Sequence, residues 1–193
     1  MELGEILKIG GLAGVVSAFF GALFKEASEW MERRRKARFL ALKLSVLLEE
    51  YFRACTDRLS DIEIYVSSHG QAGEIIVGLP DFPELPSDTA AAWLYLKPDV
   101  ADAILGLPIE IRLLDDGIRF NTDMDGGPDV NPDWTLEPLC KVALETLDLA
   151  KRTRRLHWLK RLTRTSDTEQ WVCEARDKLA LKHARRDARS IEI

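Results

Sequence analysis

The stretch from Ile9 to Phe24 contains 16 consecutive residues without a charged side chain. Adding Ile6 and Leu7, which lie on the far side of Lys8, extends the apolar run to 19 residues. A helix rises ~1.5 Å per residue, so this run is roughly 28 Å long, close to the ~30 Å hydrocarbon core of a bilayer. The run therefore predicts a membrane-spanning helix, with residues 1–30 forming an N-terminal membrane anchor.

Three other structures are compatible with an apolar run of this length: a cleaved signal peptide, a buried core helix and an interfacial helix. A signal peptide has a positively charged beginning, whereas the first residues here include Glu2 and Glu5. An interfacial helix needs a polar face, which Ile9 to Phe24 lacks. We therefore favour a span, and the residues that we expect to form it are Ile6, Ile9, Gly10, Gly14, Phe19, Phe20 and Phe24.

A cluster of basic residues follows the apolar run and predicts the orientation of the chain. Cytoplasmic flanks of membrane helices carry an excess of Lys and Arg. The expected topology is therefore a single pass, with the N-terminus outside and the C-terminal domain in the cytoplasm. Basic side chains at this position also lie beside anionic lipid headgroups. The residues of this topology and lipid-facing cluster are Arg33, Arg34, Arg35, Lys36 and Arg38.

Small residues recur at helical spacing within the apolar run. Gly10 and Gly14 form a G-x-x-x-G pattern, and Ser17 and Gly21 repeat it. Such faces allow two membrane helices to approach closely. Self-association through the Gly10 and Gly14 face is therefore an expected interaction, beside contact with the lipid bilayer and with a protein partner.

The remainder of the chain has the composition of a globular domain. Hydrophobic residues make up 46% of the sequence and charged residues 31%, values that exclude a largely disordered chain. Apolar residues recur mostly at steps of three and four, which indicates helices. The expected fold class is therefore all-α: a transmembrane helix that continues into a cytosolic helical bundle of four or five helices, residues 31–193.

The expected helices are separated by two irregular segments. Residues 67–88 are rich in Pro and Gly and predict a long crossover that lies over the helices through apolar residues such as Phe82. Residues 121–133 predict an acidic loop, and Gly106 with Pro108 predict a kink or a break in the helix that begins at Pro98. The other expected helices cover residues 26–59, 90–96, 138–164 and 167–189.

The acidic loop has partial calcium-ligand spacing. The residues at positions 1, 3, 5 and 9 of a twelve-residue calcium loop are Asn121, Asp123, Asp125 and Asp129, with glycine at position 6. Position 12 is Pro132, where a bidentate Glu is needed. A solvated helix–helix loop is the alternative that we favour, so no metal or other cofactor is predicted.

The stretch Lys151–Arg164 is the second basic segment of the chain. It contrasts with residues 61–135, which hold 3 basic and 15 acidic side chains. Three interpretations are open: a helix neutralised by the acidic middle segment, a surface that touches anionic lipid, and a nucleic-acid interface. We favour the first, and nucleic acid is the least expected partner. The residues of this candidate binding surface are Arg154, Arg155, Trp158, Lys160 and Arg161.

Patterns that carry catalysis are missing from the sequence. The three histidines and the three cysteines are widely spaced, and no G-x-S-x-G or phosphate-binding loop occurs. The sequence therefore predicts a non-enzymatic, membrane-anchored helical protein that acts in protein interaction or as a scaffold. The alternatives are a membrane-tethered nucleic-acid-binding regulator that uses residues 151–164, and an enzyme of a type without a known motif.

Two phrases carry a resemblance, GLPDFP at residues 78–83 and LKPDVADAILGLP at residues 96–108. Together with the anchor and the basic cluster after it, they cover roughly a third of the chain. In this combination the chain resembles small uncharacterised proteobacterial single-pass membrane proteins with a cytosolic helical domain. The resemblance implies a bacterial inner-membrane location and no particular activity.

Overall fold

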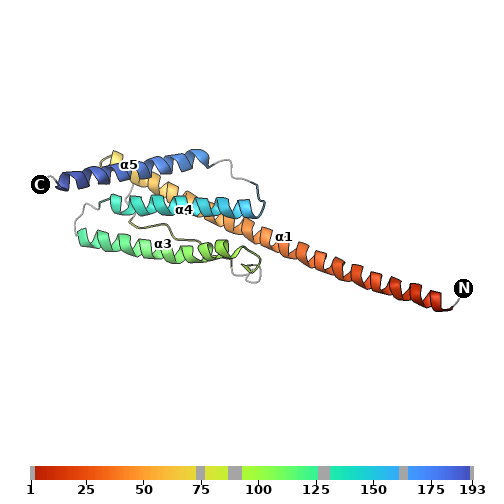
Figure 1. Ribbon diagram of the computed structural model, residues 1–193. Coiled ribbons are helices and arrows are strands. Elements are labelled where there is room, and N and C mark those ends of the chain that lie inside the picture. The colour runs from red at the N-terminus through yellow and green to blue at the C-terminus, as the bar shows by residue number, and fades with distance from the viewer. Residues whose placement is uncertain (1–2, 73–76, 87–92, 126–130, 161–164, 192–193) are drawn as a thin grey trace.

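The structure, a computed structural model, describes residues 3–72, 77–86, 93–125, 131–160 and 165–191. The side chains of residues 3–20 lie outside this description. Within the described residues the fold is all-α, as expected, and no strand is present. The four described helices are α1 (Leu3–Ser67), α3 (Pro98–Asp125), α4 (Asp133–Leu156) and α5 (Ser166–Ile191) (Figure 1).

Helix α1 is 65 residues long and dominates the architecture. Its N-terminal part extends away from the other helices, and its C-terminal part packs against them (Figure 1). The sequence has no proline in α1 and no glycine between Gly21 and Gly70, so nothing interrupts the helix. The expected helix over residues 26–59 is confirmed as part of it, and the apolar residues that it buries are Ala37, Leu40, Ala41, Leu44, Leu48, Tyr51, Phe52, Cys55, Leu59 and Ile62.

Helix α4 is the centre of the bundle, because it packs against α1, α3 and α5. It runs antiparallel to α1 and α3 (Figure 1). Apolar and small residues recur along α4 at steps of three and four, which produces a broad buried face. The fully buried residues of that face include Leu139, Val142, Ala143, Thr146, Leu147 and Ala150.

Residues 77–86 cross over α1 as an extended strap. The Tyr51 hydroxyl donates a hydrogen bond to the carbonyl of Pro80 at 3.2 Å, and the ring of Phe82 meets the Tyr51 ring edge-on at 5.0 Å. The backbone N–H of Leu79 donates to Asp115 of α3 at 2.7 Å. The predicted crossover is therefore confirmed for residues 77–86.

The sequence predicted either a kink or a break in the helix at Gly106 and Pro108. The predicted break is wrong. Helix α3 continues through both residues as far as Asp125. Proline removes one hydrogen bond from a helix, but the apolar positions on both sides of Pro108, from Val100 to Ile118, are buried on one face. Packing of an amphipathic face contributes more to helix stability than one backbone hydrogen bond, so the helix persists.

The boundaries of α4 also differ from the prediction of a helix over residues 138–164. The helix begins five residues earlier, at Asp133, whose buried carboxylate accepts hydrogen bonds from Lys182 of α5 at 2.6 and 2.8 Å. It ends at Leu156 rather than Arg164. The stretch 151–164 is therefore not one basic helix, because α4 ends at Leu156 and a turn follows at residues 157–158. The predicted last helix is confirmed as α5.

The predicted membrane span coincides with the part of α1 that extends from the bundle. The described part of the chain contains no helix that is both long and apolar enough to cross a membrane. Phe24 is exposed. The side chains of the other residues named for the span, Ile6, Ile9, Gly10, Gly14, Phe19 and Phe20, lie outside the described residues, so the span stays a prediction from the sequence.

Candidate functional site

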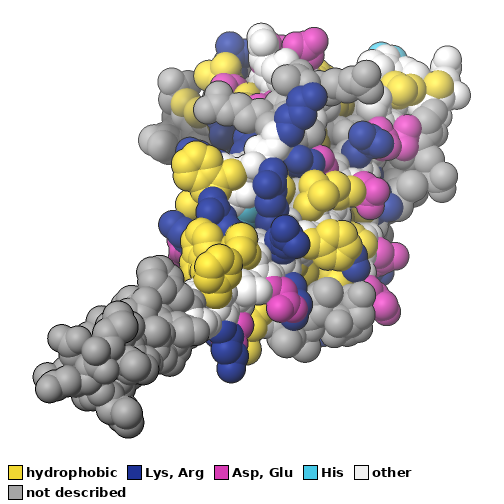
Figure 2. Space-filling model, turned by 90° about the vertical axis from the view of Figure 1, so that its right-hand side faces the viewer, with side chains coloured by type: hydrophobic (Ala, Val, Ile, Leu, Met, Phe, Trp, Pro, Cys, Tyr) yellow, Lys and Arg dark blue, Asp and Glu magenta, His cyan; other side chains and the backbone are white. Residues whose placement is uncertain are grey.

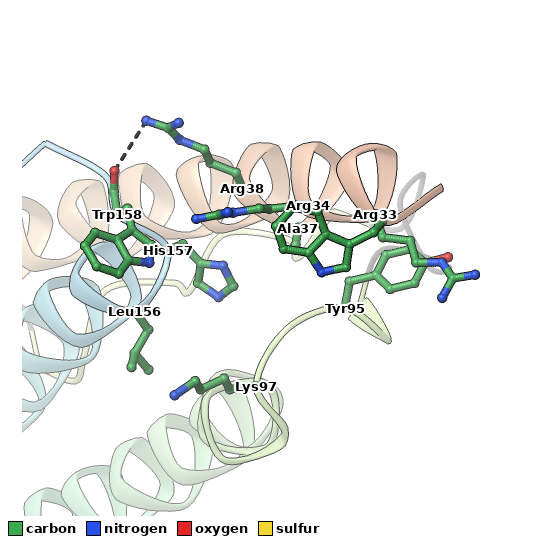
Figure 3. Close-up of a pocket in the computed structure, with 10 residues that line it drawn as sticks. Arg33, Arg34, Ala37, Arg38, Tyr95, Lys97, Leu156, His157 and Trp158 are labelled. Carbon is green, nitrogen blue, oxygen red and sulfur yellow. Dashed lines mark hydrogen bonds between the residues drawn. The ribbon is translucent and has the colours of Figure 1, made fainter. Parts of the chain in front are cut away.

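A hollow of about 370 Å³ lies where α1 leaves the bundle. It is bounded by α1, by the segment that leads into α3, and by the turn that follows α4 (Figure 3). We call it the basic–aromatic pocket. The residues that line it are Trp30, Arg33, Arg34, Ala37, Arg38, Tyr95, Lys97, Leu156, His157 and Trp158.

Helix α1 contributes half of the lining because its bundle-facing stripe continues beyond the bundle. Trp30, Arg33, Arg34, Ala37 and Arg38 are separated by steps of one and three residues, which places them on one helix face. Ala37 is buried, and toward the N-terminus the same face becomes exposed. The guanidinium of Arg34 lies over the Trp30 ring at 5.2 Å from its centroid, a cation–π distance.

The turn after α4 supplies the opposite wall. The Leu159 N–H donates to the Arg154 carbonyl at 2.9 Å and the Trp158 N–H to the Arg155 carbonyl at 3.5 Å, which is the Schellman pattern of a helix C-terminus. This motif places its C′ residue in the left-handed region, and here that residue is Trp158 with φ of 55°. Glycine is the usual residue at C′, so the backbone of a tryptophan at this position is strained.

A long-range hydrogen bond joins the two walls. Arg38 Nη2 donates to the carbonyl of Trp158 at 3.3 Å, across 120 residues of sequence (Figure 3). The Trp158 side chain is nevertheless 77% exposed. The fold therefore fixes the backbone of this residue and leaves its ring at the surface.

The pocket is strongly cationic. Its lining contains Arg33, Arg34, Arg38 and Lys97 and no acidic residue, although Arg33 also pairs with Glu29 outside the lining at 3.1 Å. Basic and hydrophobic side chains are mixed on this end of the molecule (Figure 2). The arrangement therefore suits an anion that also carries an apolar part.

His157 faces the pocket as a neutral side chain. Burial lowers its pKa from the usual 6.5, and the positive charge of Lys97 lowers it further. Its Nε2 atom is buried, and within the described residues no group forms a hydrogen bond with it. The lowered pKa favours the neutral form of the imidazole.

The basic cluster of α1 divides between two faces. Arg33, Arg34 and Arg38 line the pocket, whereas Arg35 and Lys36 do not. Lys36 pairs instead with Glu32 along the helix at 2.8 Å. The sequence prediction treated these five residues as one patch, but only the positions on the bundle-facing side belong to the pocket.

The residues of the second candidate surface, within residues 151–164, also lie in different surroundings. Arg154 turns inward and forms an ion pair with Glu49 of α1, and its side chain is only 13% exposed. Arg154 also donates to the Lys160 carbonyl at 3.1 Å, while Arg155 is exposed. Trp158 alone of the predicted set lines the pocket, and Arg161 lies outside the described residues.

The expected neutralisation by the acidic middle segment is only partly correct. Arg152 pairs with Asp99, which belongs to that segment. Arg154 pairs instead with α1, and Lys151 pairs with Glu169 of α5. Carboxylates on three different helices, α1, α3 and α5, therefore neutralise the positive charges of this stretch.

Sequence reasoning did not name six of the ten lining residues as site residues, namely Trp30, Ala37, Tyr95, Lys97, Leu156 and His157. Trp30 could have been included, because it precedes the basic cluster by one helical turn. Tyr95 and Lys97 carried no signal, since nothing in the sequence indicates that the segment before α3 meets α1. The place of His157 in the pocket follows from the turn that ends α4.

The calcium-loop candidate has a different local structure from the one its spacing requires. Asn121 and Asp123 lie in the last turns of α3 and Asp125 ends it, while Asp129 lies outside the described residues. Among the described residues no group of three or more His, Cys, Asp or Glu side chains could hold a metal ion. The four-residue candidate, which the sequence already disfavoured, is therefore not tested as a whole.

The cysteines give no sign of reactivity. All three are free, and Cys55 and Cys140 are buried. Burial raises the pKa of each of these two thiols to about 12, which disfavours the reactive thiolate. Their surroundings indicate a packing role.

Comparisons of the chain with protein-family models, with curated proteins and with solved structures found no match. No family or homologue therefore indicates an enzyme.

Proposed function

We propose that this chain is a non-enzymatic, membrane-anchored helical protein of the bacterial inner membrane that acts as a protein-interaction or scaffold component. One observation carries the proposal: α1 is a single helix from Leu3 to Ser67. The apolar run, the basic cluster and the core-forming stripe of the bundle are therefore parts of one continuous element.

This continuity gives the anchor a mechanical role. Ala37, the first buried residue among the described side chains of α1, follows Phe24 by 13 residues, about 20 Å of helix at ~1.5 Å per residue. The headgroup layer extends roughly 5–8 Å beyond the hydrocarbon core on each side, so the bundle would begin about 12–15 Å outside that layer. A helix holds the bundle at a fixed distance from the bilayer, whereas a flexible linker would not.

The partners in this proposal are the lipid bilayer, a protein, and a second copy of the chain through the Gly10 and Gly14 face. Nucleic acid is disfavoured because Arg154 is engaged with Glu49 and because α4 ends at Leu156. These two features leave residues 151–164 without a continuous basic helix for phosphate contacts.

Membrane extraction and a topology reporter test the proposal. A reporter active only in the cytoplasm, fused after Ile193, is expected to be active, and alkaline carbonate is expected to leave the protein in the membrane fraction. A Val15→Arg, Ala18→Arg variant should be released, because each arginine near a span centre costs about 2.5–3.5 kcal/mol of insertion.

The matched control carries the same two charges beyond the predicted span, as Ala27→Arg and Ser28→Arg, and should remain in the membrane. Release of the unaltered protein by carbonate would overturn the anchor. An inactive reporter on a retained protein would overturn the orientation alone.

A further inference from the structure

We propose that the basic–aromatic pocket binds the phosphate headgroup of an anionic membrane phospholipid. The choice of a lipid rests on the proposed function, because the anchor would hold the pocket beside the bilayer. The charge, the aromatic rim and the volume of the pocket support the choice of ligand.

The cations of the pocket suit a phosphate group. Arg34 extends from α1 toward the turn after α4, Lys97 lies just before α3, and Arg38 turns to the Trp158 carbonyl (Figure 3). Guanidinium groups present paired N–H donors that match phosphate oxygens, and lysine adds a compact positive charge. The lining holds four cationic side chains and no carboxylate, although Arg33 also pairs with Glu29 and Arg38 with the Trp158 carbonyl.

The aromatic residues suit the surface of a membrane. Trp30 and Trp158 are 57% and 77% exposed, and Tyr95 is also exposed. Tryptophan and tyrosine are enriched at the membrane–water interface because each joins an apolar ring to a polar group. The strained backbone of Trp158 is held by the Schellman turn and by Arg38, so its exposed ring is a fixed feature of the fold.

The position and the size of the pocket favour a lipid over a soluble phosphate compound. Trp30 follows Phe24 by six residues, about 9 Å of helix at ~1.5 Å per residue, which places the near rim at the edge of the headgroup layer. A volume of about 370 Å³ lies near the lower end for ligand pockets. It can hold a headgroup while the acyl chains remain in the bilayer.

Titration of the full chain in neutral detergent micelles tests this inference. Dihexanoyl phosphatidylglycerol is the probe, and tryptophan emission with titration calorimetry is the readout. We expect saturable binding to the unaltered protein. An Arg34→Gln, Lys97→Gln variant should lose at least tenfold in affinity, while its melting temperature stays unchanged.

The matched control is an Arg35→Gln, Lys36→Gln variant, which removes the same charge from neighbouring positions outside the pocket. Its affinity should change less than twofold. Equal losses in both variants would overturn the pocket in favour of general surface charge, and an absence of saturable binding would overturn it outright.

Two further titrations identify the source of the phosphate. Dihexanoyl phosphatidylcholine should not bind, because its headgroup has no net charge. Glycerol phosphate or inorganic phosphate that bound as tightly as the lipid would overturn the lipid assignment. Micelle binding does not depend on the carbonate and reporter experiments, so failure of the pocket and failure of the anchor give different results.

Discussion

Arg154 and Arg155 are adjacent arginines on the last turn of α4, and they have opposite surroundings. Arg154 is mostly buried against Glu49, whose side chain is 15% exposed, and it also holds the turn after α4 through the Lys160 carbonyl. Arg155 is exposed. The same side chain therefore has a structural role at one position and faces solvent at the next.

This contrast predicts different stabilities for two otherwise identical substitutions. Arg154→Gln should lower the free energy of unfolding by about 3 kcal/mol, because it leaves the Glu49 carboxylate buried without its partner. Arg155→Gln should change it by less than about 0.5 kcal/mol. Denaturant titration of the full chain in neutral detergent, followed by circular dichroism, measures both. Equal effects would show that the ion pair does not support the bundle.

At the scale of elements, the glycines of α3 and of the strap have different roles. Gly117 lies within α3, and a Cβ added to it would have no atom within 4 Å. Gly78 lies in the strap with φ of +102°, and an added Cβ would lie 2.4 Å from Asp115 Oδ1. Its carbonyl also accepts a hydrogen bond from Arg58 at 2.9 Å. Of these two glycines, Gly78 is the one that the fold requires.

Replacing each glycine by alanine should therefore change stability in opposite directions. Gly117→Ala should raise the free energy of unfolding by about 0.5–1 kcal/mol, because alanine loses less conformational entropy in a helix. Gly78→Ala should lower it by at least about 1 kcal/mol, because alanine is strained at positive φ. Thermal melting of the two variants beside the unaltered protein measures the difference, and destabilisation by both would contradict the open environment of Gly117.

At the scale of the whole molecule, the core is confined to the part of α1 that the other helices cover. Every buried residue that the structure describes lies at Ala37 or beyond. The N-terminal part of α1 extends away from α3, α4 and α5 (Figure 1). The bundle thus contains its own hydrophobic core, independent of the predicted anchor.

A fragment of residues 31–193 should therefore fold without the anchor. Its 163 residues are enough for an independent core. We expect a mainly helical circular dichroism spectrum and one cooperative thermal transition. A non-cooperative transition would show that the N-terminal part of α1 contributes to the stability of the bundle, and a spectrum dominated by β-structure would refute the fold.

The sequence determined the helices and their inward faces, because helical periodicity is local. The steps from Leu40 to Leu59 in α1 and from Val100 to Ile118 in α3 identify buried stripes without knowledge of the partners. Helix ends were less predictable. Helix α3 continues past Pro108 because one of its faces is buried. Helix α4 ends at a turn in which Trp158 has a left-handed backbone, a position where glycine usually indicates the end of a helix.

Only the tertiary structure decided which charges are neutralised and which meet in the pocket. The basic residues of α1 and of the turn after α4 looked like two separate segments, yet Arg38 and Trp158 are in contact across 120 residues. Periodicity cannot reveal such a contact, because it depends on how antiparallel helices align their ends. The two features depend on contacts over different sequence distances. A helix face depends on neighbours three and four residues away, whereas the pairing of charges depends on packing between distant elements.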